Sequence, residues 1–392
     1  MNILVVGAGM YVTGRHTAGP GSVLGTIGEL SKSMDIKGVT VVSKNESSAK
    51  DVSKAVEEIH NKVEIDLNVN FEALGDNSLD NLKRITKQND FDCAIIALPD
   101  HLHYAFGKLL IENNVHCFIV KPLTPTLKES LDLISIQKNK NVYGAVDFHK
   151  RYDEANLMIK NMIEDGQIGK PLYFTIEYSQ KIEIPTVVFA SWTEKSNVFQ
   201  YLGVHYVDMI YFLTGYYPEK AIAIGTKGRL IEKGFETFDS IHATIVWKNH
   251  KNENDMLVAQ FSTNWIDPST SSALTNQEYK VIGTKGRIEC DQKYRGIELV
   301  NEDGGVQSIN PYFSKYLSDP SGKKSYSGYD FKSISQFIYD VEDLKNGEIT
   351  IDKLENIRPT FEESLVSTAV VDAVNQSLDN YSKWIQIDDL SQ

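Results

Sequence analysis

The sequence predicts an α/β protein: an N-terminal doubly wound parallel sheet, followed by a C-terminal α+β domain with a large open, mostly antiparallel sheet. Short apolar runs alternate with helical segments over the first 147 residues, whereas long alternating runs dominate the remainder. The length of 392 residues also exceeds what one hydrophobic core usually organises. We therefore expect two domains, covering residues 1–147 and 148–392.

The first domain is predicted from buried-strand patterns separated by helical spacing. The strand-like runs are residues 2–6, 39–42, 62–71, 93–99, a run ending at Lys121, and 142–148. The segments with helical spacing are 49–61, 77–89, 103–113 and 126–138. Parallel strands point their carboxyl ends at one crevice, where open α/β folds bind ligands. Lys121 is expected at the mouth of that crevice.

The second domain is predicted from alternating runs that lack intervening helices. These runs are residues 172–178, 221–224, 241–247, 257–265, 279–290 and 297–300, with a last strand at 384–387. The expected helices are 199–213, 331–344 and 362–380. Such strands form a mostly antiparallel sheet that can leave one face open.

Charge and composition exclude several classes of function. A net charge of −13 argues against nucleic-acid binding, which needs clustered Lys and Arg. No apolar run approaches the ~20 residues of a membrane span, and the first residues enter a strand directly, so we expect a cytoplasmic protein that does not bind a membrane. Cys93, Cys117 and Cys290 form no CxxC pair, and we expect no metal site.

A glycine turn follows the first predicted strand. Gly7-Ala8-Gly9 would let a pyrophosphate approach the backbone, although Val12 replaces the usual third glycine. We expect an enlarged phosphate loop over residues 14–21 that carries Arg15 and delays the helix, with Ser22 as its N-cap. The alternative is a glycine-rich hairpin that binds no ligand.

The residues after the second predicted strand bear on the choice of cofactor. An acidic residue there would accept hydrogen bonds from the ribose of NAD, but the sequence has Ser43-Lys44-Asn45. A hydroxyl and a cation suit a 2'-phosphate, which favours NADP over NAD. The alternative is that Lys44 simply extends into water.

Four stretches together resemble the glucose-fructose oxidoreductase, inositol dehydrogenase and MocA (Gfo/Idh/MocA) family. They are Gly7-Ala8-Gly9, Pro99-Asp100-His101-Leu102-His103, Val120-Lys121-Pro122 and Gly203-Val204-His205-Tyr206-Val207-Asp208. Weaker support comes from residues 146–152, 165–171 and 283–286. In order and spacing these stretches cover nearly the whole chain.

The resemblance implies an N-terminal Rossmann domain and NAD(P)-dependent oxidation or reduction at a carbinol carbon of a sugar, nucleotide-sugar or cyclitol. It also implies a homo-oligomer, dimer or tetramer, assembled through the C-terminal sheet. The residues expected to bind the cofactor are Gly7, Gly9, Met10, Tyr11, Arg15, Ser43, Lys44, Leu98, Pro99, Asp100, His103, Lys121 and Pro122.

Lys121 is the first candidate catalytic residue. Hydride transfer from a carbinol requires removal of the hydroxyl proton, so a group that exchanges protons must lie within hydrogen-bond reach. The resemblance implies a cis bond before Pro122 and a lysine that orients substrate and shares this proton. Burial is expected to lower the pKa of Lys121. The alternative is a surface lysine before a turn.

His205 is the expected general acid and base, because imidazole exchanges protons near neutral pH. On a helix over residues 199–213 it shares a face with Tyr201 and Asp208. The family's acidic partner stands four residues before this histidine, where the present chain has Tyr201. A phenol cannot hold an imidazolium as a carboxylate does, so the expected triad is incomplete. The alternative for His205 is a core histidine.

Further candidates for the substrate site are Arg151, Tyr152 and Trp192, besides His205. Aromatic faces favour sugar rings, although all three residues are equally compatible with core or rim positions. Asp100 and His103 are expected beside the nicotinamide ribose, with helix capping as the alternative for Asp100.

Two other readings of the whole chain stay open. One is a dinucleotide-sensing or regulatory protein on the same fold without turnover, to which Tyr201 lends weight. The other is an oxidoreductase whose substrate is not a sugar, since a fold does not fix a substrate.

Overall fold

The computed structural model describes residues 1–390, and contacts divide the chain into two compact units. The first unit contains Met1–Thr124, Lys128–Asp153 and Tyr312–Ser364. The second contains Pro125–Leu127, Glu154–Pro311 and the chain from Leu365 onward. Residues 312–364, which the sequence pattern grouped with the second domain, thus pack with the first unit.

The first unit is built on a parallel sheet of six strands in the order β3-β2-β1-β4-β5-β6. The strands are β1 (Asn2–Val6), β2 (Gly38–Ser43), β3 (Val69–Ala73), β4 (Cys93–Ile96), β5 (His116–Val120) and β6 (Gly144–Asp147). Every pairing between neighbouring strands is parallel. This is the doubly wound arrangement predicted from the sequence.

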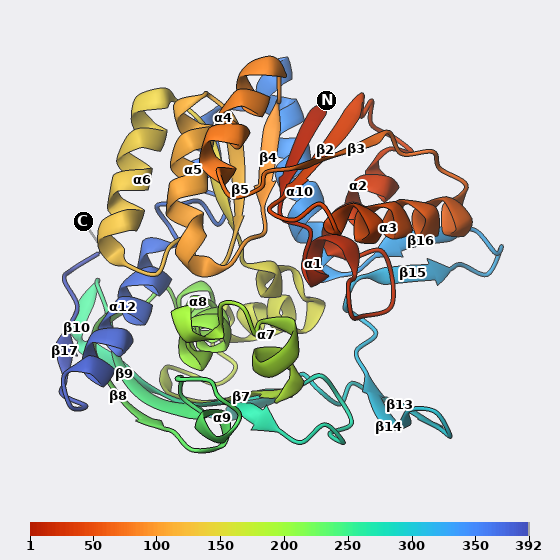
Figure 1. Ribbon diagram of the computed structural model, residues 1–392. Coiled ribbons are helices and arrows are strands. Elements are labelled where there is room, and N and C mark those ends of the chain that lie inside the picture. The colour runs from red at the N-terminus through yellow and green to blue at the C-terminus, as the bar shows by residue number, and fades with distance from the viewer. Residues whose placement is uncertain (391–392) are drawn as a thin grey trace. The chain divides into compact units, whose positions relative to one another are not determined.

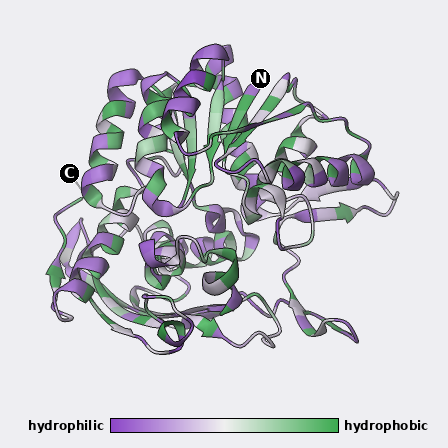
Figure 2. Cartoon of the chain, viewed as in Figure 1, coloured by the Kyte–Doolittle hydropathy of each residue, from purple (hydrophilic) through white to green (hydrophobic). Residues whose placement is uncertain are grey.

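Helices cover both faces of this sheet, as Figure 1 shows. α2 (Ser22–Leu30), α3 (Ser48–Val63) and α10 (Tyr329–Asn346) share one core with the strands. α4 (Ser78–Gln88), α5 (His103–Glu112) and α6 (Leu127–Lys140) lie together on the other face (Figure 1). The strands are hydrophobic while the helices turn polar faces outward (Figure 2), because both sheet faces are buried.

The expected strand over residues 62–71 is largely a connection. α3 continues to Val63, and β3 begins only at Val69 because the β2 ladder starts with Val39 opposite Val69. Val63, Ile65 and Leu67 nevertheless pack against the core. The alternating apolar residues that predicted a strand here belong to a segment that packs along the core without pairing with a neighbouring strand.

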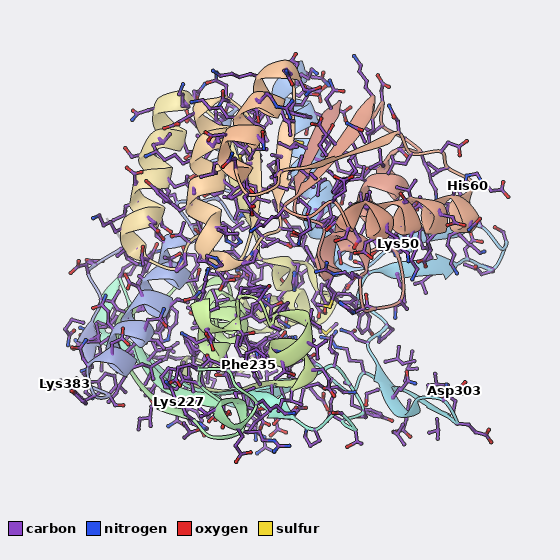
Figure 3. All side chains as sticks on the ribbon, viewed as in Figure 1. Lys50, His60, Lys227, Phe235, Asp303 and Lys383 are labelled. Atoms are coloured by element: carbon purple, nitrogen blue, oxygen red, sulfur yellow. The ribbon has the colours of Figure 1, made fainter. Side chains whose placement is uncertain are left out.

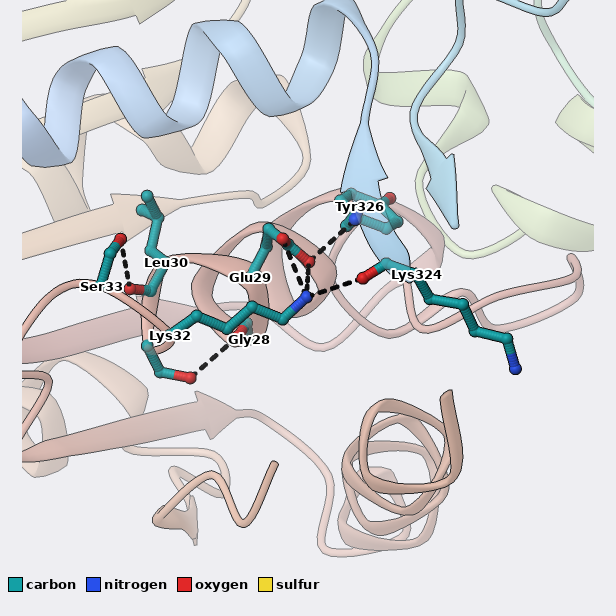
Figure 4. Close-up of polar contacts among 8 residues, drawn as sticks. Gly28, Glu29, Leu30, Lys32, Ser33, Lys324 and Tyr326 are labelled. Carbon is teal, nitrogen blue, oxygen red and sulfur yellow. Dashed lines mark hydrogen bonds and ion pairs between the residues drawn. The ribbon is translucent and has the colours of Figure 1, made fainter. Parts of the chain in front are cut away.

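Residues 312–364, which belong to the first unit, contact α2 through a hairpin of β15 (Lys315–Ser318) and β16 (Lys324–Ser327). Glu29 accepts a 2.8 Å hydrogen bond from the Tyr326 backbone N–H, and Lys32 donates at 3.0 Å to the Lys324 carbonyl (Figure 4). A Cβ on Gly25 would lie 2.7 Å from the Tyr326 ring, so the absence of a side chain at Gly25 allows the ring to pack against α2. The unit also contains α11 (Ile351–Glu355).

The second unit is built on a mixed sheet of seven strands in the order β12-β11-β7-β10-β9-β8-β17. The strands are β7 (Pro171–Lys181), β8 (Tyr217–Thr226), β9 (Ser240–Asn249), β10 (Asn252–Asp267), β11 (Thr275–Gly283), β12 (Arg287–Asp291) and β17 (Ile385–Gln386). Only β7 and β10 pair in parallel. The predicted mostly antiparallel sheet is confirmed.

Two strand predictions in this unit need correction. The run 279–290 is two antiparallel strands, β11 and β12, because a turn closed by a 2.8 Å bond from the Gly283 N–H to the Gly286 carbonyl divides it. The run 297–300 lies outside the large sheet: β13 (Ile297–Asn301) and β14 (Gly305–Ile309) form a separate hairpin. Asp303 lies at its tip (Figure 3).

One face of the large sheet carries the core of the second unit. α7 (Glu154–Glu164), α8 (Val204–Thr214) and α12 (Leu365–Asp379) pack on one another or on the strands, over the buried rings of Trp247, Trp265 and Phe261. Alternate residues on the opposite face, such as His242 and Gln260, are exposed. A short α9 (Arg229–Glu232) completes the unit.

Within residues 1–390 no helix has the length and apolar character needed to cross a membrane.

Candidate functional site

The turn after β1 contains two glycines, Gly7 and Gly9, whose surroundings differ. Gly7 has φ +115°, and a Cβ there would lie 2.2 Å from the Ala97 carbonyl oxygen. Gly7 therefore allows the backbone after β1 to approach the backbone after β4. A Cβ on Gly9 would meet no atom within 4 Å, which leaves open space beside the backbone.

The helix begins immediately after this turn, contrary to the predicted delay. α1 (Met10–Thr13) has Gly9 at its N-cap without a side-chain cap, so the turn delivers Met10 and Tyr11 to the first helical positions. The helix is then interrupted rather than postponed. The C-cap of α1 is Gly14, whose left-handed backbone (φ 72°) ends the helix; the inserted loop begins there.

The inserted loop over residues 14–21 is closed by backbone contacts between glycines. A Cβ on Gly14 would lie 1.9 Å from the Gly19 carbonyl oxygen, and one on Gly21 would lie 2.5 Å from the Val12 carbonyl. Gly21, not Ser22, is the N-cap of α2, and it has no side-chain cap. Ser22 is the first residue of α2 and donates a 2.9 Å hydrogen bond to Asp330.

The inserted loop brings a cation to the start of α3. The Arg15 guanidinium lies 3.8 Å from Asp51, and Ser43 Oγ lies 3.3 Å from Ser48 Oγ. Ser48 and Asp51 belong to the first turn of α3, which follows β2. Arg15 and Ser43, both predicted to bind the cofactor, therefore contact the same helical turn.

Lys44 has a different partner. Its ammonium lies 3.2 Å from Asp76, and both side chains are largely exposed to solvent, at 64% and 95%. Such an exposed pair is a weak interaction, worth about 0–1 kcal/mol. Lys44 is thus held only loosely and remains accessible to an anion.

Lys121 follows β5, and the bond between Lys121 and Pro122 is cis, as expected. Burial lowers the pKa of Lys121 to about 8, while the negative charges of Asp100 and Asp147 oppose this shift. The side chain is therefore poised to exchange a proton slightly above neutral pH, as a proton-transfer group requires.

The turn after β4 contains three of the residues predicted to bind the cofactor. Leu98 and Pro99 are partly buried and lead into a 3-10 turn, Asp100–Leu102. Pro99 is the N-cap of that turn and Leu102 is the N-cap of α5, so Asp100 caps neither helix. Asp100 is instead a buried carboxylate that acts electrostatically on Lys121.

His103 is fully buried and connects two turns. Its Nδ1 lies 2.8 Å from the Pro122 carbonyl oxygen and its Nε2 lies 2.9 Å from the Leu98 carbonyl oxygen. Both ring nitrogens thus contact backbone, and His103 braces the turns that follow β4 and β5.

A cluster of buried carboxylates near these turns was not predicted from the sequence. Asp147, at the end of β6, accepts hydrogen bonds from the Tyr11 hydroxyl at 2.5 Å and the Ser333 hydroxyl at 2.7 Å. Burial alone would raise the pKa of Asp147, but His149, Tyr11 and Ser333 hold it below its usual range. The one indication in the sequence was Asp147 itself, a charged residue at the end of an apolar strand.

A second buried carboxylate, Asp330, belongs to the same cluster. His149 Nδ1 lies 3.4 Å from Asp330 and 3.8 Å from Asp147. Burial raises the pKa of Asp330 to about 6, against the opposing charge of His149. Two carboxylates near one imidazole thus differ in pKa because Asp147 has more hydrogen-bond donors.

Arg151 and Tyr152, expected to line a substrate site, are held inside the first unit. Arg151 is 7% exposed, forms a 2.5 Å ion pair with Glu363 and lies 5.5 Å from the Phe148 ring centroid. Burial raises the pKa of Tyr152 to about 12.

The predicted helix over residues 199–213 begins with a π-helical turn. Phe199–Gly203 is π-helical and α8 starts at Val204, so the α-helical spacing used to align Tyr201 with His205 does not apply there. His205 is 5% exposed, and its ring centroid lies 6.0 Å from that of Tyr178. Asp208 is 2% exposed.

Tyr201 and Trp192 belong to one aromatic cluster in the second unit. Their ring centroids are 6.0 Å apart, and Phe189 contacts both, at 4.8 Å from Tyr201 and 4.4 Å from Trp192. The ring centroid of Trp265 lies 6.0 Å from that of Tyr201. Two predicted site residues are therefore brought together, with Tyr201 and Trp192 both partly exposed.

Over the described residues 1–390, no group of three or more His, Cys, Asp or Glu side chains is arranged to hold a metal ion.

Comparison with known families assigns both units. Residues 1–148 match the oxidoreductase family with an NAD-binding Rossmann fold, and residues 156–289 match the GFO/IDH/MocA C-terminal domain. The chain belongs to the Gfo/Idh/MocA family. Its members with the matching N-terminal domain are NAD-binding oxidoreductases, which agrees with the open space beside Gly9.

Relatives of this Gfo/Idh/MocA protein match it over part of its length. An uncharacterised oxidoreductase, YrbE, of Bacillus subtilis is 25% identical over 57% of this chain and 62% of its own length. The scyllo-inositol 2-dehydrogenase (NADP(+)) IolW of the same organism is 27% identical over 42% of this chain and 45% of its own. The chain thus spans about half to three-fifths of these relatives.

The fold of this Gfo/Idh/MocA protein is shared more completely. A crystal structure of scyllo-inositol dehydrogenase from Lactobacillus casei, with bound NAD(H) and scyllo-inositol, covers 98% of both chains with a TM-score of 0.67 and 16% sequence identity. This similarity confirms the α/β architecture.

Proposed function

We propose that this protein transfers a hydride between a nicotinamide cofactor, with NADP preferred over NAD, and a carbinol carbon of a sugar, nucleotide-sugar or cyclitol. The observation that carries the proposal is Lys121, whose pKa is lowered to about 8 by burial at the carboxyl end of β5 in an NAD-binding fold. We also propose that the protein works in the cytoplasm as a homo-oligomer that contacts neither nucleic acid nor membrane.

The first unit has a place for each charged part of a dinucleotide. The open space beside Gly9 fits a pyrophosphate, since a Cβ there would occupy it. Ser43 and Arg15 at the first turn of α3, together with the accessible Lys44, suit the 2'-phosphate of NADP. When bound, the nicotinamide ring would accept or supply the hydride.

Lys121 supplies proton exchange in this proposal. At pH 7 to 8 both of its protonation states are populated, because burial brings its pKa to about 8. It can therefore hold the substrate hydroxyl by a hydrogen bond and take or return its proton without a large energetic cost. His205 is the second proton-transfer group, since imidazole changes charge in the same range.

Tyr201 and Trp192 support the choice of substrate class. Their partly exposed rings are fixed by Phe189 and Trp265. Rigid aromatic faces pack on the apolar faces of sugar rings, while the Tyr201 hydroxyl can donate a hydrogen bond to a substrate oxygen. Because the relative IolW and the similar Lactobacillus casei structure are scyllo-inositol dehydrogenases, we favour a cyclitol or a sugar of similar size as the substrate.

The test is a cofactor titration followed by a substrate panel. Binding of NADPH and NADH is measured by fluorescence, and sugars, nucleotide-sugars and cyclitols are screened by absorbance of the reduced nicotinamide. We expect Lys121→Ala and His205→Ala each to lower turnover at least ~100-fold with cofactor affinity maintained.

Exposed residues of the same types provide matched controls. Lys128→Ala and His242→Ala alter an exposed lysine and an exposed histidine, and should leave turnover within about twofold. If Lys121→Ala and His205→Ala behave like these controls, the proposed assignment of both catalytic residues is wrong.

A further inference from the structure

The ends of β5 and β6 place a carboxylate next to the proposed catalytic lysine. The two strands are parallel neighbours with Val120 opposite Asp147, and Lys121 is the residue after Val120. Asp147 is only 2% exposed. Its charge favours the ammonium form of Lys121, against the effect of burial. The register therefore places Asp147 within one ladder position of Lys121, and the Asp147 charge acts on the lysine amine.

Asp147 is fixed in one orientation by a donor on each oxygen. The Tyr11 hydroxyl donates to Oδ2 at 2.5 Å and the Ser333 hydroxyl donates to Oδ1 at 2.7 Å. Donors on both oxygens stabilise the ionised form, and the pKa of Asp147 is lowered despite its burial. Asp147 thus carries its negative charge throughout the neutral pH range.

Other charged groups lie near Lys121 and Asp147. Asp100, in the turn after β4, is the second anion that acts on Lys121. His149 Nδ1 lies 3.8 Å from Asp147 and 3.4 Å from Asp330. The charge of Lys150 acts on Asp330. Of the two carboxylates, Asp330 is thus the nearer to His149.

We infer that Asp147 is a positioning residue that keeps the Lys121 side chain charged and oriented for proton exchange, with Tyr11 and Ser333 holding its carboxylate in place. Because Tyr11 lies in the helix that follows the glycine turn, the same hydrogen bond connects this helix to the Asp147 carboxylate. The consequence for turnover rests on the proposed function, but the effect on the charge of Lys121 does not.

The measurement is the pH dependence of amine labelling in the full-length protein. Limiting acetic anhydride acetylates only the uncharged amine, and mass spectrometry of the Lys121 peptide against the exposed Lys128 gives the midpoint of Lys121. Asp147→Asn keeps the shape of the side chain and removes its charge. We expect the Lys121 midpoint to fall by roughly 1 pH unit, as the loss of a nearby opposite charge predicts.

Two further variants separate charge from structural damage. Asp330→Asn neutralises a second buried carboxylate of the same cluster, which lies 3.4 Å from His149, so the Lys121 midpoint should change much less than in Asp147→Asn. Tyr11→Phe removes a donor that orients and ionises Asp147, so the Lys121 midpoint should also fall, but by less than in Asp147→Asn. This variant decides the matter if Asp147→Asn does not fold.

Each outcome addresses the inference or the proposed function separately. An unchanged midpoint in folded Asp147→Asn, or an equal fall in Asp330→Asn, overturns the role of Asp147. If Asp147→Asn does not fold, a midpoint that fails to fall in Tyr11→Phe overturns it too. A midpoint that falls as expected in a protein that reduces no substrate of the panel supports the inference and counts against the proposed function. In an active enzyme, the pH profile of kcat should shift in the same direction as the midpoint.

Discussion

His103 and Pro122 are joined by a 2.8 Å contact between the imidazole Nδ1 and the Pro122 carbonyl oxygen. The opposite nitrogen of the same ring lies 2.9 Å from the Leu98 carbonyl oxygen. A neutral imidazole donates to one carbonyl, whereas only the protonated ring donates to both. In either state, one side chain holds the turn after β4 against the turn that carries Lys121.

Replacing His103 should therefore destabilise the first unit. His103→Phe fills a similar volume but leaves two buried carbonyl groups without this donor, which costs about 2–4 kcal/mol. We expect a clear fall in Tm by differential scanning calorimetry. His60→Ala is the control, because the His60 side chain is 52% exposed and pairs with the 93% exposed Asp66. Equal Tm values for the two variants would contradict a bracing role for His103.

The two glycines of the turn should respond differently to alanine. Gly7→Ala places a Cβ 2.2 Å from the Ala97 carbonyl oxygen at a φ of +115°, so this variant should fold poorly or not at all. Gly9 has φ −82° and its Cβ would meet nothing, so Gly9→Ala should keep the wild-type Tm.

The prediction for Gly9→Ala concerns binding instead of stability. A methyl group in the space proposed for the pyrophosphate should weaken NADPH at least tenfold, or about 1.4 kcal/mol. Fluorescence titration provides the measurement, with circular dichroism as the test of folding. Wild-type affinity in Gly9→Ala would place the pyrophosphate elsewhere.

The parts of the fold that follow from local pattern could be predicted from the sequence. β1 coincides with its expected range and β2 exceeds it by one residue at each end, because buried parallel strands are short apolar runs bounded by turn residues. Gly7 and Lys121 could be placed for the same reason: each directly follows such a run.

The contacts that complete the candidate site could not be predicted in this way. Tyr11 and Asp147 are 136 residues apart, and Ser22 and Asp330 are 308 apart, so no local pattern connects them. The π-helical turn at Tyr201 is a second case, since it changes the residue spacing without a compositional sign. Tertiary packing, not periodicity, determines both features.

The choice between NADP and NAD should depend on Lys44. Lys44→Asp places a carboxylate where a hydroxyl-bearing ribose is favoured and a 2'-phosphate is repelled, so the preference should change from NADPH to NADH. Affinities for both cofactors are compared at low ionic strength, where exposed charges are least screened. Equal affinities before and after the change would remove Lys44 from cofactor selection.

Asp76 provides the complementary variant. It pairs with Lys44 at 3.2 Å, and Asp76→Asn removes the competing negative charge without a change of shape. We expect NADPH to bind a few-fold tighter, by about 0.5–1 kcal/mol, while NADH affinity stays constant. A parallel gain for both cofactors would mean that Asp76 acts on a part of the dinucleotide that they share.

Asp330 should make the wild-type protein less stable as pH rises through the range 4 to 6. Its folded pKa is about 6, whereas an unfolded aspartate has a pKa of about 3.9. The folded state therefore binds the extra proton between these values, and its release above pH 6 costs roughly 3 kcal/mol relative to pH below 4. Asp330→Asn cannot release a proton and lacks this penalty.

The stability difference between Asp330→Asn and the wild type should consequently move in favour of the variant by roughly 1–2 kcal/mol between pH 5 and 7.5. Thermal unfolding at both pH values measures it as a relative gain in Tm of a few degrees. Asp303→Asn, at the exposed tip of the β13–β14 hairpin, is the control and should show no such change with pH. A constant difference for Asp330→Asn would show that His149 and Ser22 keep Asp330 ionised in the folded protein at pH 5, and that burial does not dominate its titration.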